Sequence, residues 1–279
     1  MSSMLARIDW GWRWLGTAFS FLLFGIGGVF LSLVVFPLLR LIPGSSEKRQ
    51  RRAKKVVHRT FLFYIRLMRF LGVLSYRTEN LEALKGARLV LANHPSLLDV
   101  VFLIALIPNA NCVVKGRLLR HIWTRGPIMQ AGYILNHDQE DVIEQANRAM
   151  ARGDTLIVFP EGTRTQPGEP LALRRGASQV AVRCNTDITP VIIHCAPTTL
   201  TKQDRWYQVP RSRVRFQISV KPLIPVAPFV ENTVASRAAR SLTRHLTEYF
   251  NQEVSLHEQS APGTQKNDYR RAGSGGYNA

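Results

Sequence analysis

Residues 87–99 have the sequence ARLVLANHPSLLD, and this stretch decides the fold class. Residues 87–92 are almost all apolar and do not alternate with polar residues, which is typical of a strand that is buried on both faces of a sheet. Residues 97–106 have the length and composition of a helix. The polar residues between them therefore lie where a predicted buried strand ends and a predicted helix begins.

The same pattern recurs along the chain. Further buried strands are predicted at residues 111–114, 155–159 and 188–195, whereas Val214–Val220 alternates and is predicted as an edge strand. Helices are predicted at residues 97–106, 138–152, 174–184 and 232–250. Because strands and helices alternate, we expect an α/β fold with a mainly parallel sheet flanked by helices.

The polar residues after the first strand include His94 and Asp99. Catalytic groups of α/β proteins commonly lie at the carboxyl edge of the sheet, where this segment is predicted. A carboxylate five residues away can fix the tautomer of an imidazole and leave its other nitrogen free as a general base. We therefore predict a catalytic pair, although a histidine before a proline would on its own be taken for a loop residue.

A second polar motif, FPEGTRT at residues 159–165, directly follows another predicted buried strand. Pro160 ends that strand, and Gly162 permits a backbone conformation that other residues avoid. Arg164 offers a planar fork of donors that suits a phosphate. Two strands of the predicted sheet would thus deliver a base and an anion-binding group to one edge of the sheet.

Together the two motifs resemble the glycerolipid acyltransferase family, specifically its PlsC-type 1-acylglycerol-3-phosphate acyltransferases. That family is marked by an Asn-His-x4-Asp block and a Phe-Pro-Glu-Gly-Thr-Arg block about 60 to 70 residues apart. Two weaker blocks are also similar to family blocks, one at residues 115–118 continuing to 132–134 and one at residues 188–191. The resemblance covers residues 75–225.

The resemblance implies transfer of a fatty acyl group from a thioester to the hydroxyl of a lysophospholipid, with 1-acylglycerol-3-phosphate giving phosphatidic acid. It implies His94 as the general base and Asp99 as the group that orients it. The residues expected to bind the acceptor are Lys115, Glu161, Gly162, Thr163 and Arg164. Acyl-CoA or acyl carrier protein would be the acyl donor, and neither a metal nor a further cofactor is implied.

One departure from the family pattern concerns the acceptor. Members often carry an arginine a few residues after the glycine of the second block, where this chain has LNHD at residues 135–138. An alternative is therefore an enzyme of the same type that acylates a different acceptor, such as a lyso-aminolipid or a glycolipid precursor.

The chain of 279 residues is strongly basic, with 37 Lys and Arg against 19 Asp and Glu and a net charge of +18. The electrostatic field of so large a positive net charge attracts nucleic acid or an anionic membrane surface. Much of the excess lies beside an apolar segment, which favours the membrane, and we expect no nucleic-acid partner. The three cysteines, Cys112, Cys184 and Cys195, have no metal-site or disulfide spacing and are expected to be reduced and buried.

Residues 15–39 contain no charged side chain. This stretch of 25 residues is longer than the roughly 20 apolar residues that a helix needs to cross a bilayer. Gly25, Gly27, Gly28 and Pro37 leave open a helical hairpin that dips into one leaflet. Basic residues are concentrated after this segment, so the positive-inside rule places the rest of the chain in the cytoplasm. We expect a protein of the cell (inner) membrane with its catalytic domain on the cytoplasmic face.

The basic stretch that follows is predicted to be an amphipathic helix with two possible environments. Arginine and lysine recur at helical spacing, which suits a helix at a lipid surface; packing against the domain itself is the alternative. The expected organisation is a membrane segment at 1–45, an interfacial helix at 46–78, an acyltransferase domain at 79–254 and a disordered tail at 255–279.

A non-enzymatic alternative is a membrane-tethered anion-binding protein. It would account for the net charge of +18 but would leave both motifs to coincidence.

Overall fold

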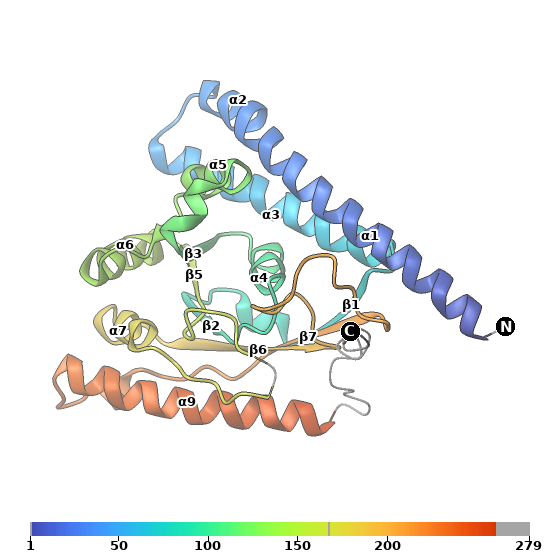
Figure 1. Ribbon diagram of the computed structural model, residues 1–279. Coiled ribbons are helices and arrows are strands. Elements are labelled where there is room, and N and C mark those ends of the chain that lie inside the picture. The colour runs from blue at the N-terminus through green and yellow to red at the C-terminus, as the bar shows by residue number, and fades with distance from the viewer. Residues whose placement is uncertain (1, 167, 261–279) are drawn as a thin grey trace, which may run out of the picture.

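The computed structural model describes residues 2–166 and 168–260, which form an α/β fold around a seven-stranded sheet (Figure 1). The strand order is β1-β7-β6-β2-β5-β3-β4, and all neighbours are parallel except the antiparallel pair β6 and β7. The strands are β1 (Leu74–Glu79), β2 (Leu89–Ala92), β3 (Ala110–Val114), β4 (Ile134–Leu135), β5 (Thr155–Val158), β6 (Ile188–Ala196) and β7 (Val214–Val220). The predicted fold class is confirmed.

Helices cover both faces of this sheet (Figure 1). The α-helices are α1 (Ser2–Phe30), α2 (Phe36–Leu41), α3 (Ser46–Phe70), α4 (Asp99–Leu106), α5 (Ile122–Ala131), α6 (Gln139–Ala151), α7 (Arg175–Arg183), α8 (Ala227–Val230) and α9 (Ala235–Ser260). Short 3₁₀ turns lie at η2 (Leu81–Leu84) and η3 (Gly116–Arg120), and a π-helical segment at η1 (Leu31–Val35) joins α1 to α2.

The strand β2 is fully buried because both its faces are covered. Leu89 and Leu91 lie in a core with α6, α7 and α9, whereas Val90 and Ala92 lie in the opposite core with α3 and α4. A strand buried on both faces needs apolar residues at every position, which is the pattern that predicted it.

The prediction that β7 is an edge strand is wrong. β1 pairs with it along its free side, so β7 lies second from the end of the sheet and β1 and β4 form the edges. β7 nevertheless alternates because Arg215 is exposed while Val214 and Phe216 are buried. Alternation of polar and apolar residues shows which faces of a strand are covered. It does not show whether the strand has a neighbour on each side in the sheet.

The N-terminal apolar segment is one continuous helical stretch, Met4–Leu41, and not a helical hairpin. By length and composition it could cross a membrane, and little of it is buried by the protein. Its outward side exposes a stripe of large apolar side chains, namely Met4, Leu5, Ile8, Trp12, Leu15, Phe19, Leu22, Ile26, Phe30, Leu33, Leu38 and Leu41. This stripe associates the protein with a membrane.

The basic helix α3 packs on the domain. Val57, Tyr64, Ile65 and Met68 are buried in the core that includes α4, so the domain-packed alternative holds for this side of the helix. The sheet also begins earlier than expected, because β1 starts at Leu74, inside the segment assigned to the interfacial helix.

The C-terminal helix α9 runs to Ser260 and is longer than predicted. Residues 255–260 are therefore helical, although they were assigned to the disordered tail. The remainder of that predicted tail, residues 261–279, lies outside the described residues.

Candidate active site

The parallel pairing of β2 and β5 brings the two sequence motifs together. Leu91 of β2 is in register with Val158 of β5, so the segments that follow the two strands leave the same edge of the sheet. β3 pairs with β5 on its other side and delivers Lys115 to that edge. The structure thus places every predicted site residue at the carboxyl edge of three adjacent strands.

His94 and Asp99 are in direct contact. The Nδ1 of His94 lies 2.8 Å from Oδ2 of Asp99, and that same oxygen accepts a hydrogen bond from the Ser96 N–H at 2.7 Å. The carboxylate is fully buried, whereas the imidazole is 17% exposed and stacks on Phe159 with ring centroids 4.2 Å apart. An Nδ1–H that donates to the carboxylate leaves Nε2 as the nitrogen that can meet a substrate hydroxyl.

The buried position of Asp99 affects its ionisation. Burial raises the pKa of Asp99, while hydrogen bonds from His94 and Ser96 and the charge of Arg164 oppose this rise. These donors stabilise the carboxylate form, which is the form that can orient an imidazole and stabilise an imidazolium.

Asn93 fixes the segment that carries His94. Its amide nitrogen donates to the Ile193 carbonyl at 2.8 Å, and its Oδ1 accepts from the Ile193 N–H at 2.7 Å. This side chain bonds to β6 as a strand residue would. The asparagine of the first motif therefore has a structural explanation that the sequence did not reveal.

Glu161 points inward, although the family resemblance implied a role in substrate binding. Its side chain is 5% exposed, and Oε1 accepts a hydrogen bond from the His94 backbone N–H at 2.8 Å. Burial, with a further contribution from the nearby Asp99, raises the pKa of Glu161 to about 7. The geometry supports a role in holding the His94 backbone.

We expect Glu161 to make the folded state less stable as the pH rises. The pKa of Glu161 is higher in the folded than in the unfolded chain. The contribution of Glu161 to the free energy of unfolding is therefore fully present below about pH 4.5, and up to roughly 3 kcal/mol of it is lost as the pH rises through 7. Thermal unfolding in detergent at pH 5 and pH 8 measures this for the wild type and for Glu161→Gln. The difference between the two proteins should favour the wild type more at pH 5, and a difference independent of pH would contradict the raised pKa.

Arg164 lies between the motif and a distant loop. One of its guanidinium nitrogens donates to the carbonyls of Leu200 and Thr201, at 2.6 and 2.9 Å. Gly162 has a φ of +68°, and a side chain there would meet Arg174 at 3.1 Å. Thr163 is half-buried on the same turn. The motif is therefore a compact turn in which Arg164 both ties down a loop and faces the site.

The site is surrounded by more cations than the sequence motifs indicated. Partial burial of its ammonium group, together with the charges of Arg117, Arg174, Lys202 and Arg164, lowers the pKa of Lys115. Arg117 is part of the second block, but Arg174 and Lys202 lie far away in sequence and carry no motif that would have identified them. Together the five residues make this edge of the sheet a region that attracts an anion.

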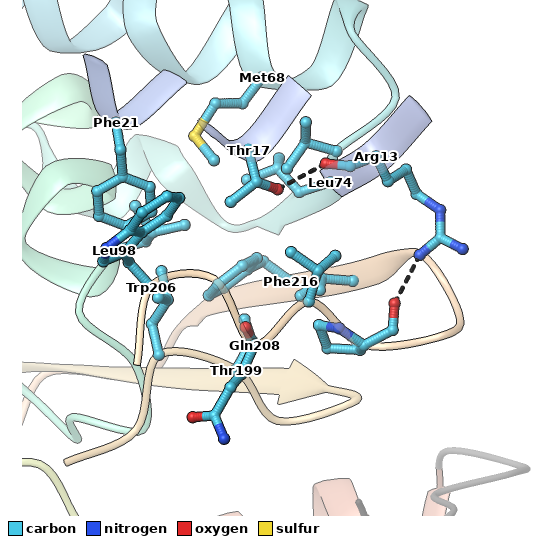
Figure 2. A pocket seen from close by; sticks show the side chains of 15 residues that line it. Arg13, Thr17, Phe21, Met68, Leu74, Leu98, Thr199, Trp206, Gln208 and Phe216 are labelled. Atoms are coloured by element: carbon cyan, nitrogen blue, oxygen red, sulfur yellow. Dashed lines mark hydrogen bonds between the residues drawn. The ribbon is translucent and has the colours of Figure 1, made fainter. Parts of the chain in front are cut away.

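An apolar pocket adjoins this edge, between α1, the end of α3 and the loop before β7. Figure 2 shows Phe21, Leu98 and Trp206 on one side of it, and the rings of Phe21 and Trp206 are 5.8 Å apart. Arg13 closes the opposite end by donating to the Pro210 carbonyl at 2.9 Å. Leu98 directly precedes Asp99, so the pocket adjoins the turn that carries His94 and Asp99.

The three cysteines are all free thiols, of which Cys112 and Cys195 are buried and Cys184 is half-buried. Within residues 2–166 and 168–260, no group of His, Cys, Asp or Glu is arranged to hold a metal ion.

Comparison with known proteins connects this geometry to a family. Residues 73–194, which include both motifs and all five strands from β1 to β5, match the family model described as Acyltransferase. This part of the chain therefore resembles an acyltransferase domain.

Enzymes named 1-acyl-sn-glycerol-3-phosphate acyltransferase resemble this part of the chain. A 1-acyl-sn-glycerol-3-phosphate acyltransferase of Helicobacter pylori is 30% identical over 39% of this chain and 48% of its own length. The human beta enzyme of that name is 26% identical over 47% of this chain and 50% of its own. These matches span about half the length of both relatives. The human alpha enzyme is 24% identical over 89% of this chain and 84% of its own.

A solved structure shows the same fold. The 1-acyl-sn-glycerophosphate acyltransferase PlsC of Thermotoga maritima superposes with a TM-score of 0.66 at 17% identity, covering 90% of this chain and 97% of that one. The likeness in fold extends beyond residues 73–194 to the N-terminal helices.

Proposed function

We propose that the protein transfers a fatty acyl group from a thioester donor to the free hydroxyl of 1-acylglycerol-3-phosphate, which gives phosphatidic acid. The observation that carries this proposal is the pairing of His94 with a buried Asp99 beside a cluster of cations. The relatives named for this reaction support the choice of acceptor. Acyl-CoA or acyl carrier protein supplies the thioester.

In the proposed mechanism His94 acts as a general base through Nε2. It takes the proton of the acceptor hydroxyl while that oxygen attacks the thioester carbonyl carbon, and Asp99 stabilises the imidazolium that forms. Breaking the carbon–sulfur bond releases the donor thiolate, which takes the proton back from His94. The acyl group passes directly to the acceptor, and no acyl-enzyme is formed.

The cations around the site are proposed to bind the acceptor phosphate. Arg164 and Lys115 are the predicted ligands, and Arg117, Arg174 and Lys202 add to the attraction because their charges act on Lys115. Arg164 keeps its position through its bonds to the Leu200 and Thr201 carbonyls, so little side-chain entropy is lost when a phosphate binds.

We propose that the N-terminal helix lies along the membrane, in the leaflet that faces the cytoplasm. Contacts with the domain run from Trp10, which donates to the Val209 carbonyl, to Arg40, which donates to Gln130. Crossing the bilayer steeply would carry the attached α/β domain into hydrocarbon. Lying flat, the helix keeps its apolar stripe in lipid and the site at the interface.

We expect His94→Ala to lower kcat by a factor of roughly 10² to 10⁴, because the variant lacks the general base. The measurement is release of free thiol from acyl-CoA by the detergent-purified protein with lysophosphatidic acid. His245→Ala, on the exposed side of α9, is the matched control and should retain full activity. Equal rates for wild type and His94→Ala would refute the catalytic assignment.

The acceptor is tested in the same assay with a panel of lysolipids. The position where relatives carry an arginine is occupied here by residues 135–138, and the His137 ring lies against Gly116 in the second block. Turnover with a lyso-aminolipid or a glycolipid precursor, and not with lysophosphatidic acid, would keep the mechanism and replace the acceptor.

A further inference from the structure

The helix α5 exposes an unusual amount of apolar surface for its length. Ile122, Trp123 and Met129 are 55%, 42% and 57% exposed on a helix of ten residues. The fully described helices α6 and α7 expose no large apolar side chain, although they also cover the sheet. Packing against the domain therefore leaves part of α5 in need of another apolar environment.

This helix is fixed directly against the membrane-associated helix. A side chain at Gly28 would lie 2.4 Å from the Trp123 carbonyl oxygen, and one at Gly126 would lie 2.1 Å from Oγ of Ser32. Both contacts require glycine, so the two backbones are nearly in van der Waals contact. Arg40 also donates a hydrogen bond to Gln130, so contacts join α5 to the N-terminal helix from Gly28 to Arg40.

The apolar surface of α5 continues that of α1 and α2. Phe30, Leu33 and Leu38 are exposed on the part of the N-terminal helix that packs against α5. Ser32 of that part has its Oγ 3.5 Å from the Ile122 carbonyl oxygen, so the exposed apolar residues of the two segments lie on adjoining helices, although the segments are about 90 residues apart in the chain. A membrane in contact with one of the two helices therefore lies close to the other.

The charges around α5 are complementary to an anionic lipid surface. Residues 110–137 contain Lys115, Arg117, Arg120 and Arg125 and no aspartate or glutamate. Arg125 lies between Ile122 and Met129 on the same side of the helix, where its long side chain can reach headgroups while its neighbours lie deeper.

We propose that α5 inserts into the membrane interface as a third lipid-contacting helix. It then holds η3, with Lys115 and Arg117, at the level of the lipid headgroups. If the proposed function is right, an acceptor lipid beside α5 presents its phosphate to these residues without leaving its leaflet. Insertion itself does not depend on that function.

Spin labelling tests the insertion. The full chain with Cys184→Ala carries a nitroxide at Met129→Cys, at Leu22→Cys as the lipid reference, or at Arg240→Cys as the exposed reference on α9. In vesicles of phosphatidylcholine and phosphatidylglycerol, collision with oxygen and with a water-soluble nickel chelate reports the depth of each label. We expect the Met129 label to be shielded from nickel like the Leu22 label.

Three results would overturn the proposal. These are a Met129 label as accessible to nickel as the Arg240 label, a Leu22 label that is itself exposed to water, and dipolar broadening at Met129 that shows a second copy covering α5. Acyl transfer is assayed separately on the same proteins. A shielded Met129 label in a protein without acyltransferase activity would refute the proposed function and leave the insertion standing.

A kinetic measurement tests the consequence for the acceptor. The double variant Ile122→Asp, Met129→Asp should raise KM several-fold for long-chain lysophosphatidic acid in vesicles, but not for a short-chain acceptor dissolved in water. Val234→Asp, which changes a 65% exposed side chain near α9, is the matched control. Unchanged KM values on vesicles would contradict a role of α5 in lipid access.

Discussion

Asp99→Asn is expected to lower kcat by at least about a hundredfold while KM for both substrates changes little. In the wild type the carboxylate accepts from Nδ1 of His94 and from the Ser96 N–H. Both bonds go to the single atom Oδ2, so an amide that keeps them places its only oxygen there and carries no charge. The imidazolium that forms during proton transfer then lacks the carboxylate that stabilises it.

The control for this variant is Asp187→Asn. Asp187 also accepts a backbone hydrogen bond, from Val226, but it precedes β6 and so lies at the opposite edge of the sheet from the site. Thiol release should be normal in this protein. If Asp99→Asn were as active as the control, the negative charge of Asp99 would have no part in the reaction.

Asp154→Ala is expected to destabilise the fold by about 3–5 kcal/mol, because it leaves a buried ammonium without its partner. Lys54 and Asp154 are 3% and 5% exposed, and their charged atoms lie 2.5 Å apart. Burial lowers the pKa of Lys54, and the hydrogen bond to Asp154 opposes this effect. The measurement is the thermal unfolding of the detergent-solubilised protein.

A second variant distinguishes loss of the charge partner from loss of packing. Replacing both residues, as Lys54→Met with Asp154→Leu, should recover most of the lost stability, since no charge is left unpaired. Glu82→Ala removes one partner of the exposed pair with Lys85 and should change stability little. A double variant as unstable as Asp154→Ala would show that the charge is not the cause.

The central part of the fold could be predicted because the burial of its strands is visible in their residue types. β2 and β5 are buried on both faces, so each is a continuous apolar run, and the polar motif after each marks the carboxyl edge. β4 has two residues, and α5 contains Gly126 and Pro127, so neither leaves a reliable pattern. The position of β7 depended on pairing with β1, which is about 140 residues away.

The site was predictable to a similar degree. The contact between His94 and Asp99 is local, and their spacing together with the second motif at residues 159–165 was enough to predict it. The inward direction of Glu161 was not predictable, because it depends on which backbone N–H the neighbouring strand presents. The contribution of Arg174 and Lys202 depends on loops that return from distant parts of the chain, and the spacing of residues carries no information about them.

The hydrogen bonds of Asn93 to Ile193 have a consequence for motion. They join the histidine segment to a central strand, so we expect its amide protons to exchange as slowly as those of the sheet. We therefore expect the His94 backbone to move little on the time scale of turnover. Changes that adapt the protein to different lipids would then occur in the segments around the site, without moving His94.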